Sequence, residues 1–225
     1  MVSHKSKREI KFIKKESPIY PSLLREIADP PSGIYIWGNL PEEERPRIAI
    51  VGTRKATTAG KFIAKRVARE LGDLGAVIVS GLAMGIDTAA HEGALEAKTE
   101  TIAVLGNGLD SIYPRQNENL ANRIIEAHGA IISEYPAGTP AFPGQFLERN
   151  RIVSGMCLAT IIIEAPIDSG ALVTARLAAE QGREVFVFPG PVEHLNYRGS
   201  HKLIRDGARL VSSVQDIIED LKIEV

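Results

Sequence analysis

Six short apolar runs recur along the chain, and each ends in small or polar residues. They span 48–51, 77–79, 102–105, 131–133, 161–163 and 185–188. Segments with helical periodicity lie between most of them. Strands that are apolar on both faces and alternate with helices are typical of a parallel sheet covered on both sides. The pattern therefore predicts an α/β fold with a doubly wound, mostly parallel sheet, whose ligands bind at the carboxyl ends of the strands.

The connecting segments complete this prediction. Residues 136–146, rich in proline and glycine, are expected to form a long loop near the point where the strand order reverses. Residues 1–15 are expected to be a flexible basic tail, and 16–225 a single domain. We expect helices near 21–28, 57–74, 86–97, 117–128, 170–182, 198–206 and 213–221, and an edge strand at 33–37.

Composition narrows the possible functions. The chain of 225 residues is 44% hydrophobic and 24% charged, as in ordinary globular proteins, and its net charge of −1 disfavours a generic polyanion binder without excluding a local basic site. No apolar run is long enough for a membrane span, and the first residues lack the apolar core of a secretory signal. A single cysteine fits a reducing compartment, so we expect a cytoplasmic protein. The histidines show no metal-ligand spacing, and we expect neither a metal nor a cofactor.

The first core strand runs into Gly52, Thr53 and Arg54, and Thr57 or Thr58 can cap the helix that follows. Glycine permits a close approach to the backbone, free amides at a helix start attract phosphate, and arginine adds a forked donor. The alternative is a plain turn with an exposed arginine. The turn is neither a dinucleotide-binding fingerprint nor a P-loop.

The second core strand ends in a turn of small residues. Ser80, Gly81 and Gly85 could form a nest of amides for an anion. Asp87 and His91 share a helix face four residues apart and could form an acid–base pair. We favour a structural role, with Asp87 near the helix start and His91 packed over it.

Arginines follow two further strands. Arg115 comes after Tyr113-Pro114, and it either faces a ligand or is merely solvated. Arg149, Asn150 and Arg151 suit a clamp on backbone phosphates, with Phe146 as a stacking face. The alternative for this segment is a surface helix with a weak arginine–glutamate pair.

One further turn offers a phosphate site. Ser169 caps the helix after the fifth core strand, and Gly170 exposes the first amides of that helix.

Read together, these stretches resemble the DNA-processing protein A family (DprA, also called Smf) from about residue 20 to residue 208. The resemblance implies an extended Rossmann-like domain that binds single-stranded DNA, forms a homodimer and helps to load a RecA-type recombinase, without chemical turnover. It implies that the turn at Arg54 contributes to the DNA pocket. It also implies roles for Arg115, at an often basic position, and for the motif of Arg149 and Arg151.

Two other interpretations stay open. One is a nucleotide-processing enzyme of the related phosphoribohydrolase group, which combines a glycine-rich phosphate turn with a catalytic glutamate one helical turn later. The comparable segment here, 169–176, contains no acid. The other is a sensor of small phosphorylated ligands. Competition of mononucleotides with oligo-dT would identify such a sensor.

Overall fold

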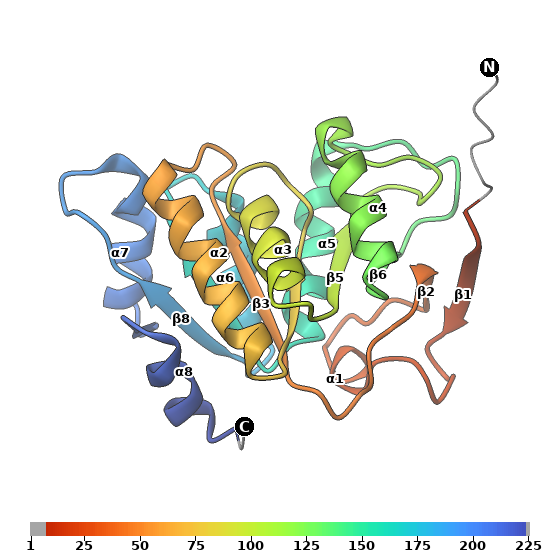
Figure 1. The fold of residues 1–225 in the computed structure, drawn as a ribbon, viewed down its shortest axis with the longest axis horizontal. Helices are drawn as coiled ribbons and strands as arrows, with labels where there is room; N and C mark the ends of the chain where they lie inside the picture. The colour runs from red at the N-terminus through yellow and green to blue at the C-terminus, as the bar shows by residue number, and fades with distance from the viewer. Residues whose placement is uncertain (1–7, 224–225) are drawn as a thin grey trace.

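The six apolar runs form neighbouring strands of one nine-stranded sheet in a computed structural model that describes residues 8–223 (Figure 1). The strands are β3 (Arg47–Gly52), β4 (Val77–Ser80), β5 (Thr101–Leu105), β6 (Ala130–Ser133), β7 (Ala159–Ile163) and β8 (Glu184–Phe188). They are parallel to one another, and β9 (Arg209–Leu210) adds a short parallel strand at the edge. The predicted α/β, doubly wound, mostly parallel sheet is confirmed.

The strand order is β1-β2-β6-β5-β4-β3-β7-β8-β9. The chain steps outward from β3 to β6, crosses back to β7 on the other side of β3, and then steps outward again. The order thus reverses between β3 and β7, whose carboxyl ends lie side by side in register, with Gly52 opposite Ile163. A ligand is expected at this switch point.

Helices cover both faces of the sheet, because successive strand residues point to opposite sides. Ile48 and Ile50 pack with α2 (Thr58–Asp73), α3 (Ile86–Glu96) and α8 (Val214–Leu221). Ala49 and Val51 face the other layer, with α5 (Pro143–Gly155), α6 (Gly170–Glu180) and α7 (Arg198–Arg205). The remaining helical elements are α1 (Ser22–Arg25), α4 (Glu118–Glu126), η1 (Arg115–Asn117) and η2 (Leu195–Tyr197).

The N-terminal prediction is wrong where the structure describes it. Residues expected in the basic tail form β1 (Ile10–Lys14), which pairs antiparallel with β2 (Gly33–Gly38). β2 is therefore an inner strand and not the expected edge. Ile10 and Ile13 supply apolar contacts between the lysines, and the Arg8 guanidinium lies 4.6 Å from the centre of the Trp37 ring. Residues 1–7 of the predicted tail lie outside the described residues.

The predicted loop at 136–146 is shorter than expected, and the helix α5 that follows it was not among the predicted helices. α5 starts at Pro143, where a proline costs no helical hydrogen bond, and the Gln145 side chain accepts a hydrogen bond of 3.0 Å from the Phe142 amide. α5 is the crossover helix between β6 and β7, and it places Phe146 and Arg149 beside the switch point.

Within residues 8–223, no helix combines the length and the apolar character needed to cross a bilayer. The same residues hold no group of three or more histidine, cysteine or carboxylate side chains arranged to bind a metal ion.

Candidate functional site

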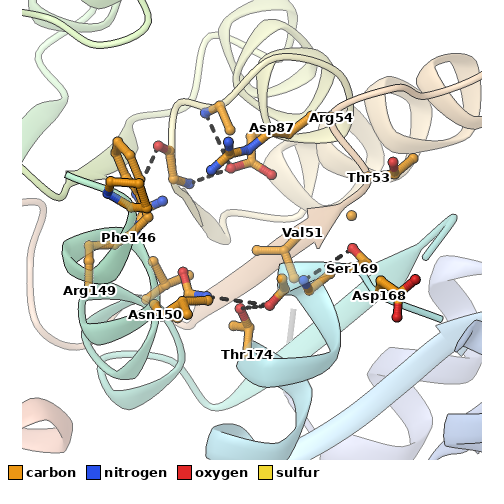
Figure 2. Close-up of a pocket in the computed structure, with 18 of the residues that line it drawn as sticks. Val51, Thr53, Arg54, Asp87, Phe146, Arg149, Asn150, Asp168, Ser169 and Thr174 are labelled. Carbon is orange, nitrogen blue, oxygen red and sulfur yellow. Dashed lines mark hydrogen bonds between the residues drawn. The ribbon is translucent and has the colours of Figure 1, made fainter. Parts of the chain in front are cut away.

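A cavity of about 570 Å³ opens at the switch point (Figure 2). The turns after β3, β4 and β7, the loop after β5 and one face of α5 form its walls. Figure 2 shows α5 residues on one side, residues of the β7–α6 turn on the other, and Val51 between them. The polar and aromatic side chains that line it are Thr53, Arg54, Lys55, Asp87, Tyr113, Phe146, Arg149, Asn150, Asp168, Ser169 and Thr174.

The turn after β3 supplies an exposed cation of the cavity, Arg54. A Cβ on Gly52 would collide with the Ile163 carbonyl, so this position admits only glycine without a shift of the neighbouring strand. The Thr53 amide donates to the Glu164 carbonyl at 2.8 Å, and Thr53 is buried. These two contacts hold the turn against β7 and leave the exposed Arg54 to project over the cavity.

Arg54 takes part in a layered arrangement at the rim. Its guanidinium carbon lies 5.4 Å from the centre of the Phe146 ring. The ring of Tyr113 stacks on the ring of Phe146, with the two ring centroids 5.3 Å apart and the ring planes 26° from parallel. A cation over a stacked aromatic pair offers both a phosphate contact and a flat face for a planar group.

The helix start after this turn is already occupied by a carboxylate of the chain itself. Glu164, fully buried, accepts hydrogen bonds from the Thr57 amide at 2.9 and 3.2 Å and from the Asn196 side chain at 2.9 Å. Thr57 caps α2 as expected, since its hydroxyl accepts from the Gly60 amide at 3.0 Å. The positive end of α2 is therefore satisfied by Glu164, and the phosphate site expected there is filled.

The predicted anion nest after β4 is filled in the same way. The Asp87 carboxylate accepts from the amides of Gly81 and Ala83 at 3.1 and 3.3 Å. Burial raises the pKa of Asp87, and the nearby Arg149 acts in the opposite direction. Ser80 lies outside the cavity, because its hydroxyl is buried and donates to the Ile50 carbonyl at 2.7 Å. Ser80 was predicted to contact the ligand, but in the structure its hydroxyl links β4 to β3.

Asp87 and His91 do not act as a pair. The His91 Nδ1 atom lies 2.8 Å from the Thr101 hydroxyl on β5, and the ring is fully buried. Burial lowers the pKa of His91 to about 3, so the ring is neutral at physiological pH. The structural interpretation is supported for both residues, although His91 packs against β5 and is not placed over the carboxylate of Asp87.

The two arginines of the α5 motif point in different directions. Residues two apart on an α-helix differ by about 200° around its axis. Arg149 faces the cavity floor and is only 5% exposed, and its Nη1 atom donates to the carbonyls of Gly81 and Val104. Burial lowers the pKa of Arg149 to about 10. Its charge thus acts on the cavity from below, whereas a clamp would have to reach outward.

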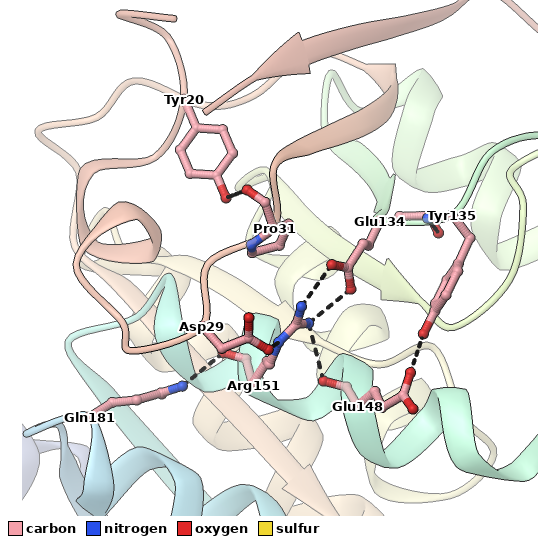
Figure 3. A network of polar contacts seen from close by, with 9 residues as sticks. Tyr20, Asp29, Pro31, Glu134, Tyr135, Glu148, Arg151 and Gln181 are labelled. Carbon is pink, nitrogen blue, oxygen red and sulfur yellow. Dashed lines mark hydrogen bonds and ion pairs between the residues drawn. The ribbon is translucent and has the colours of Figure 1, made fainter. Parts of the chain in front are cut away.

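Arg151 turns away from the cavity altogether (Figure 3). Its guanidinium makes a bidentate ion pair with Glu134 at 2.7 and 2.9 Å and a further bond to Asp29 at 3.1 Å. Figure 3 shows the three side chains converging between α5, β6 and the loop before β2. Arg151 therefore ties these segments together, and the structure does not bring it to the cavity with the other predicted site residues.

The helix start after β7 remains open to the cavity. The Ser169 hydroxyl accepts from the Ala171 amide at 3.2 Å, and nothing lies within 4 Å of a Cβ built on Gly170. Asn150 reaches the Gly170 carbonyl from α5 at 3.4 Å. Of the three expected phosphate positions, this is the one that faces the cavity without a carboxylate of the chain bound to its amides.

The remaining cations lie nearby. Arg115 is exposed in η1, two residues after Tyr113, but it does not line the cavity. Lys55 also lines the cavity. It was not predicted as a site residue, because it lies one position beyond the motif Gly52-Thr53-Arg54. Among residues 8–223, no ion pair involves Arg54, Lys55 or Arg115.

Fold and site together define a Rossmann-like protein whose switch-point cavity has a cationic, aromatic rim and whose own carboxylates fill two of its anion positions. The family described as DNA recombination-mediator protein A matches residues 11–222, and the chain belongs to this family. Protein Smf of Escherichia coli is 41% identical over 94% of the chain, which spans 56% of that relative's length.

Two solved structures are closely similar. DNA processing protein A from Streptococcus pneumoniae superposes with a TM-score of 0.90 at 38% identity, over 96% of this chain and 76% of that one. The Helicobacter pylori protein superposes with a TM-score of 0.83 at 32% identity, over 96% of both chains. That structure was described for a unique mode of single-stranded DNA binding by the H. pylori protein. The extended Rossmann-like fold expected from the resemblance is confirmed.

Proposed function

We propose that this chain is a non-enzymatic recombination mediator that binds single-stranded DNA in the switch-point cavity. The observation that carries the proposal is the layer of Arg54, Phe146 and Tyr113 at the rim. Unpaired bases expose flat faces that stack on aromatic rings, whereas in a duplex those faces are buried in the base stack. The single-stranded DNA binding described for the H. pylori relative supports the proposal.

Backbone contacts supply the remaining affinity. Arg54 and Lys55 stand at the rim, take part in none of the ion pairs between residues 8 and 223, and can neutralise phosphates. The Gly170 amide at the start of α6 and the side chain of Asn150 offer a second phosphate position across the cavity. Contacts of this kind are sequence-independent and salt-sensitive, and they position a strand without reading its bases.

A nucleotide-processing enzyme fits the site less well. Glu164 and Asp87 occupy two of the amide clusters that would otherwise hold phosphate groups. The β7–α6 turn continues into α6 without an acid between Ser169 and Arg176. Release of free base from nucleoside monophosphates by the pure protein would overturn the non-enzymatic proposal.

We also propose a homodimer that helps to load a RecA-type recombinase onto the bound strand, and a cytoplasmic location. Membership in the recombination-mediator family supports the recombinase partner. Sedimentation measurements test the dimer. Strand exchange by a RecA-type recombinase on DNA coated with single-strand-binding protein tests the loading, and no stimulation by this chain would refute it.

The central experiment compares single-stranded and duplex oligonucleotides across a salt series. We expect tight, salt-dependent binding of oligo-dT and weak binding of the duplex. Arg54→Ala and Phe146→Ala should each weaken oligo-dT binding. The matched control is Arg176→Ala, which removes an exposed arginine from α6 outside the cavity. Unchanged affinity in both rim variants would remove the cavity as the binding site.

A further inference from the structure

The outward face of α2 carries an exposed aromatic ring among cations. Phe62 is 64% exposed, although α2 otherwise buries its apolar side chains against β3 and β4. Residues three, four and seven apart on a helix share a face. This spacing places Lys65, Arg66 and Arg69 beside Phe62. We call these four residues the α2 strip.

The α2 strip lies on the helix that directly follows the cavity rim along the chain. α2 begins three residues after Lys55, and Figure 1 shows it running from the carboxyl edge of the sheet down one face. The twelve residues from Thr58 to Arg69 cover about 17 Å, because eleven steps of the helical rise separate the first from the last. That length matches up to about five nucleotides at the roughly 3.4 Å spacing of stacked bases. Arg54 and Lys55 bridge the cavity to the start of α2.

The cations of the strip are available to a polyanion. Lys65 pairs with Glu96 of α3 at 2.7 Å, and Arg66 lies 3.8 Å from Glu70. Surface pairs of this kind contribute little free energy, so a phosphate can compete for either cation. Arg69 is exposed and takes part in none of the ion pairs described for residues 8–223.

We propose that the α2 strip binds the part of a single-stranded DNA that leaves the cavity, with Phe62 stacking on a base and Arg69 contacting a phosphate. The proposal rests on the proposed function of the cavity and extends its footprint. Charge complementarity favours a nucleic acid over a second protein chain, because three cations follow the aromatic ring on its own helix face.

The test uses the full chain and two lengths of oligo-dT. A strand of about six nucleotides should fill the cavity alone, whereas one of about twenty should also reach the strip. Phe62→Ala should weaken binding of the long strand about fivefold or more, the low end of base–aromatic stacking, and leave the short strand unchanged. Arg69→Ala should lower the slope of log affinity against log salt by about 0.7, again only for the long strand.

Controls separate this proposal from the function of the cavity. Arg54→Ala should weaken both strands, and Phe12→Ala, which removes an exposed aromatic ring on β1, should weaken neither. If Arg54→Ala weakens both strands while the α2 variants weaken neither, the strip is refuted and the cavity stands. If Phe62→Ala changes only the sedimentation of the protein, the strip binds another chain, and the proposal is likewise overturned.

Discussion

Replacing Arg151 by alanine should destabilise the fold and leave DNA binding unchanged, although Arg151 belongs to the same short motif as Arg149. The reason is the ion-pair network between α5, β6 and the loop before β2. Arg151 is only 15% exposed, and both of its terminal nitrogens reach the Glu134 carboxylate. Arg54→Ala should weaken DNA binding and leave the stability of the fold unchanged, because Arg54 is exposed and forms no ion pair among residues 8–223.

The size of the effect follows from the contacts. Hydrogen bonds to charged groups contribute about 1.5–3 kcal/mol when partly buried, and the bidentate pair with Glu134 belongs to this class. Asp29 is 83% exposed, so its bond adds little. We expect Arg151→Ala to lower the free energy of unfolding by about 2 kcal/mol, which corresponds to a fall in Tm of about 4–8 °C for a chain of this size.

Two measurements check this prediction. Urea denaturation should give a lower midpoint for Arg151→Ala and an unchanged midpoint for Arg54→Ala. A salt series with oligo-dT should show a slope reduced by about 0.7 for Arg54→Ala and an unchanged slope for Arg151→Ala. An Arg151→Ala protein that is as stable as the parent and binds DNA with a reduced slope would refute the assignment of Arg151 to the internal network.

Three further predictions concern His91, Gly52 and Glu164. The pKa of His91 is lowered to about 3 in the folded protein, so the unfolded chain binds a proton at His91 below pH 6.5 while the folded chain does so only near pH 3. The contribution of His91 to stability is therefore full above pH 6.5. It falls by about 2 kcal/mol between pH 6.5 and pH 5. The difference in urea midpoint between the parent and His91→Gln should shrink over this range, and a constant difference would contradict the assignment. Gly52→Ala should destabilise the protein by about 2 kcal/mol or more, because the new methyl group meets the Ile163 carbonyl, and calorimetry with a wild-type Tm would show that the strands relax freely. Glu164→Gln should cost about 1–2 kcal/mol in urea denaturation, since α2 loses the negative charge at its N-terminus; an unchanged midpoint would mean that the Thr57 amide is satisfied without that charge.

Much of the fold could be predicted because its strands are short, apolar on both faces and followed by turn residues. The N-terminal strand β1 was not predicted, because its apolar residues stand between lysines. A charged edge strand has the composition of a solvated tail. Its pairing with β2 depends on Ile13 and on the stacking of Arg8 over Trp37, which bring together residues distant in the sequence.

The cavity could be predicted as a place, but the role of each residue could not. Arg54 reaches the rim as expected, because a turn after a strand points its side chain outward. Arg149 and Arg151 were predicted to form one phosphate clamp. Residues two apart on a helix point to nearly opposite sides, so the two side chains contact different parts of the fold. The buried Glu164 gave no local signal of its contact with Thr57, since the two residues are 107 positions apart in the sequence.

Glu164 and Asp87 have a consequence for selectivity among phosphorylated molecules. A free nucleotide would depend on a few strong amide contacts, and at two of these positions it would meet a carboxyl side chain of the protein instead. A polymer can spread many weak contacts along the rim and needs neither position. In this chain two of the amide clusters at the switch point hold the chain's own acids, and the helix start after β7 is the one among the three that a phosphate group can still approach.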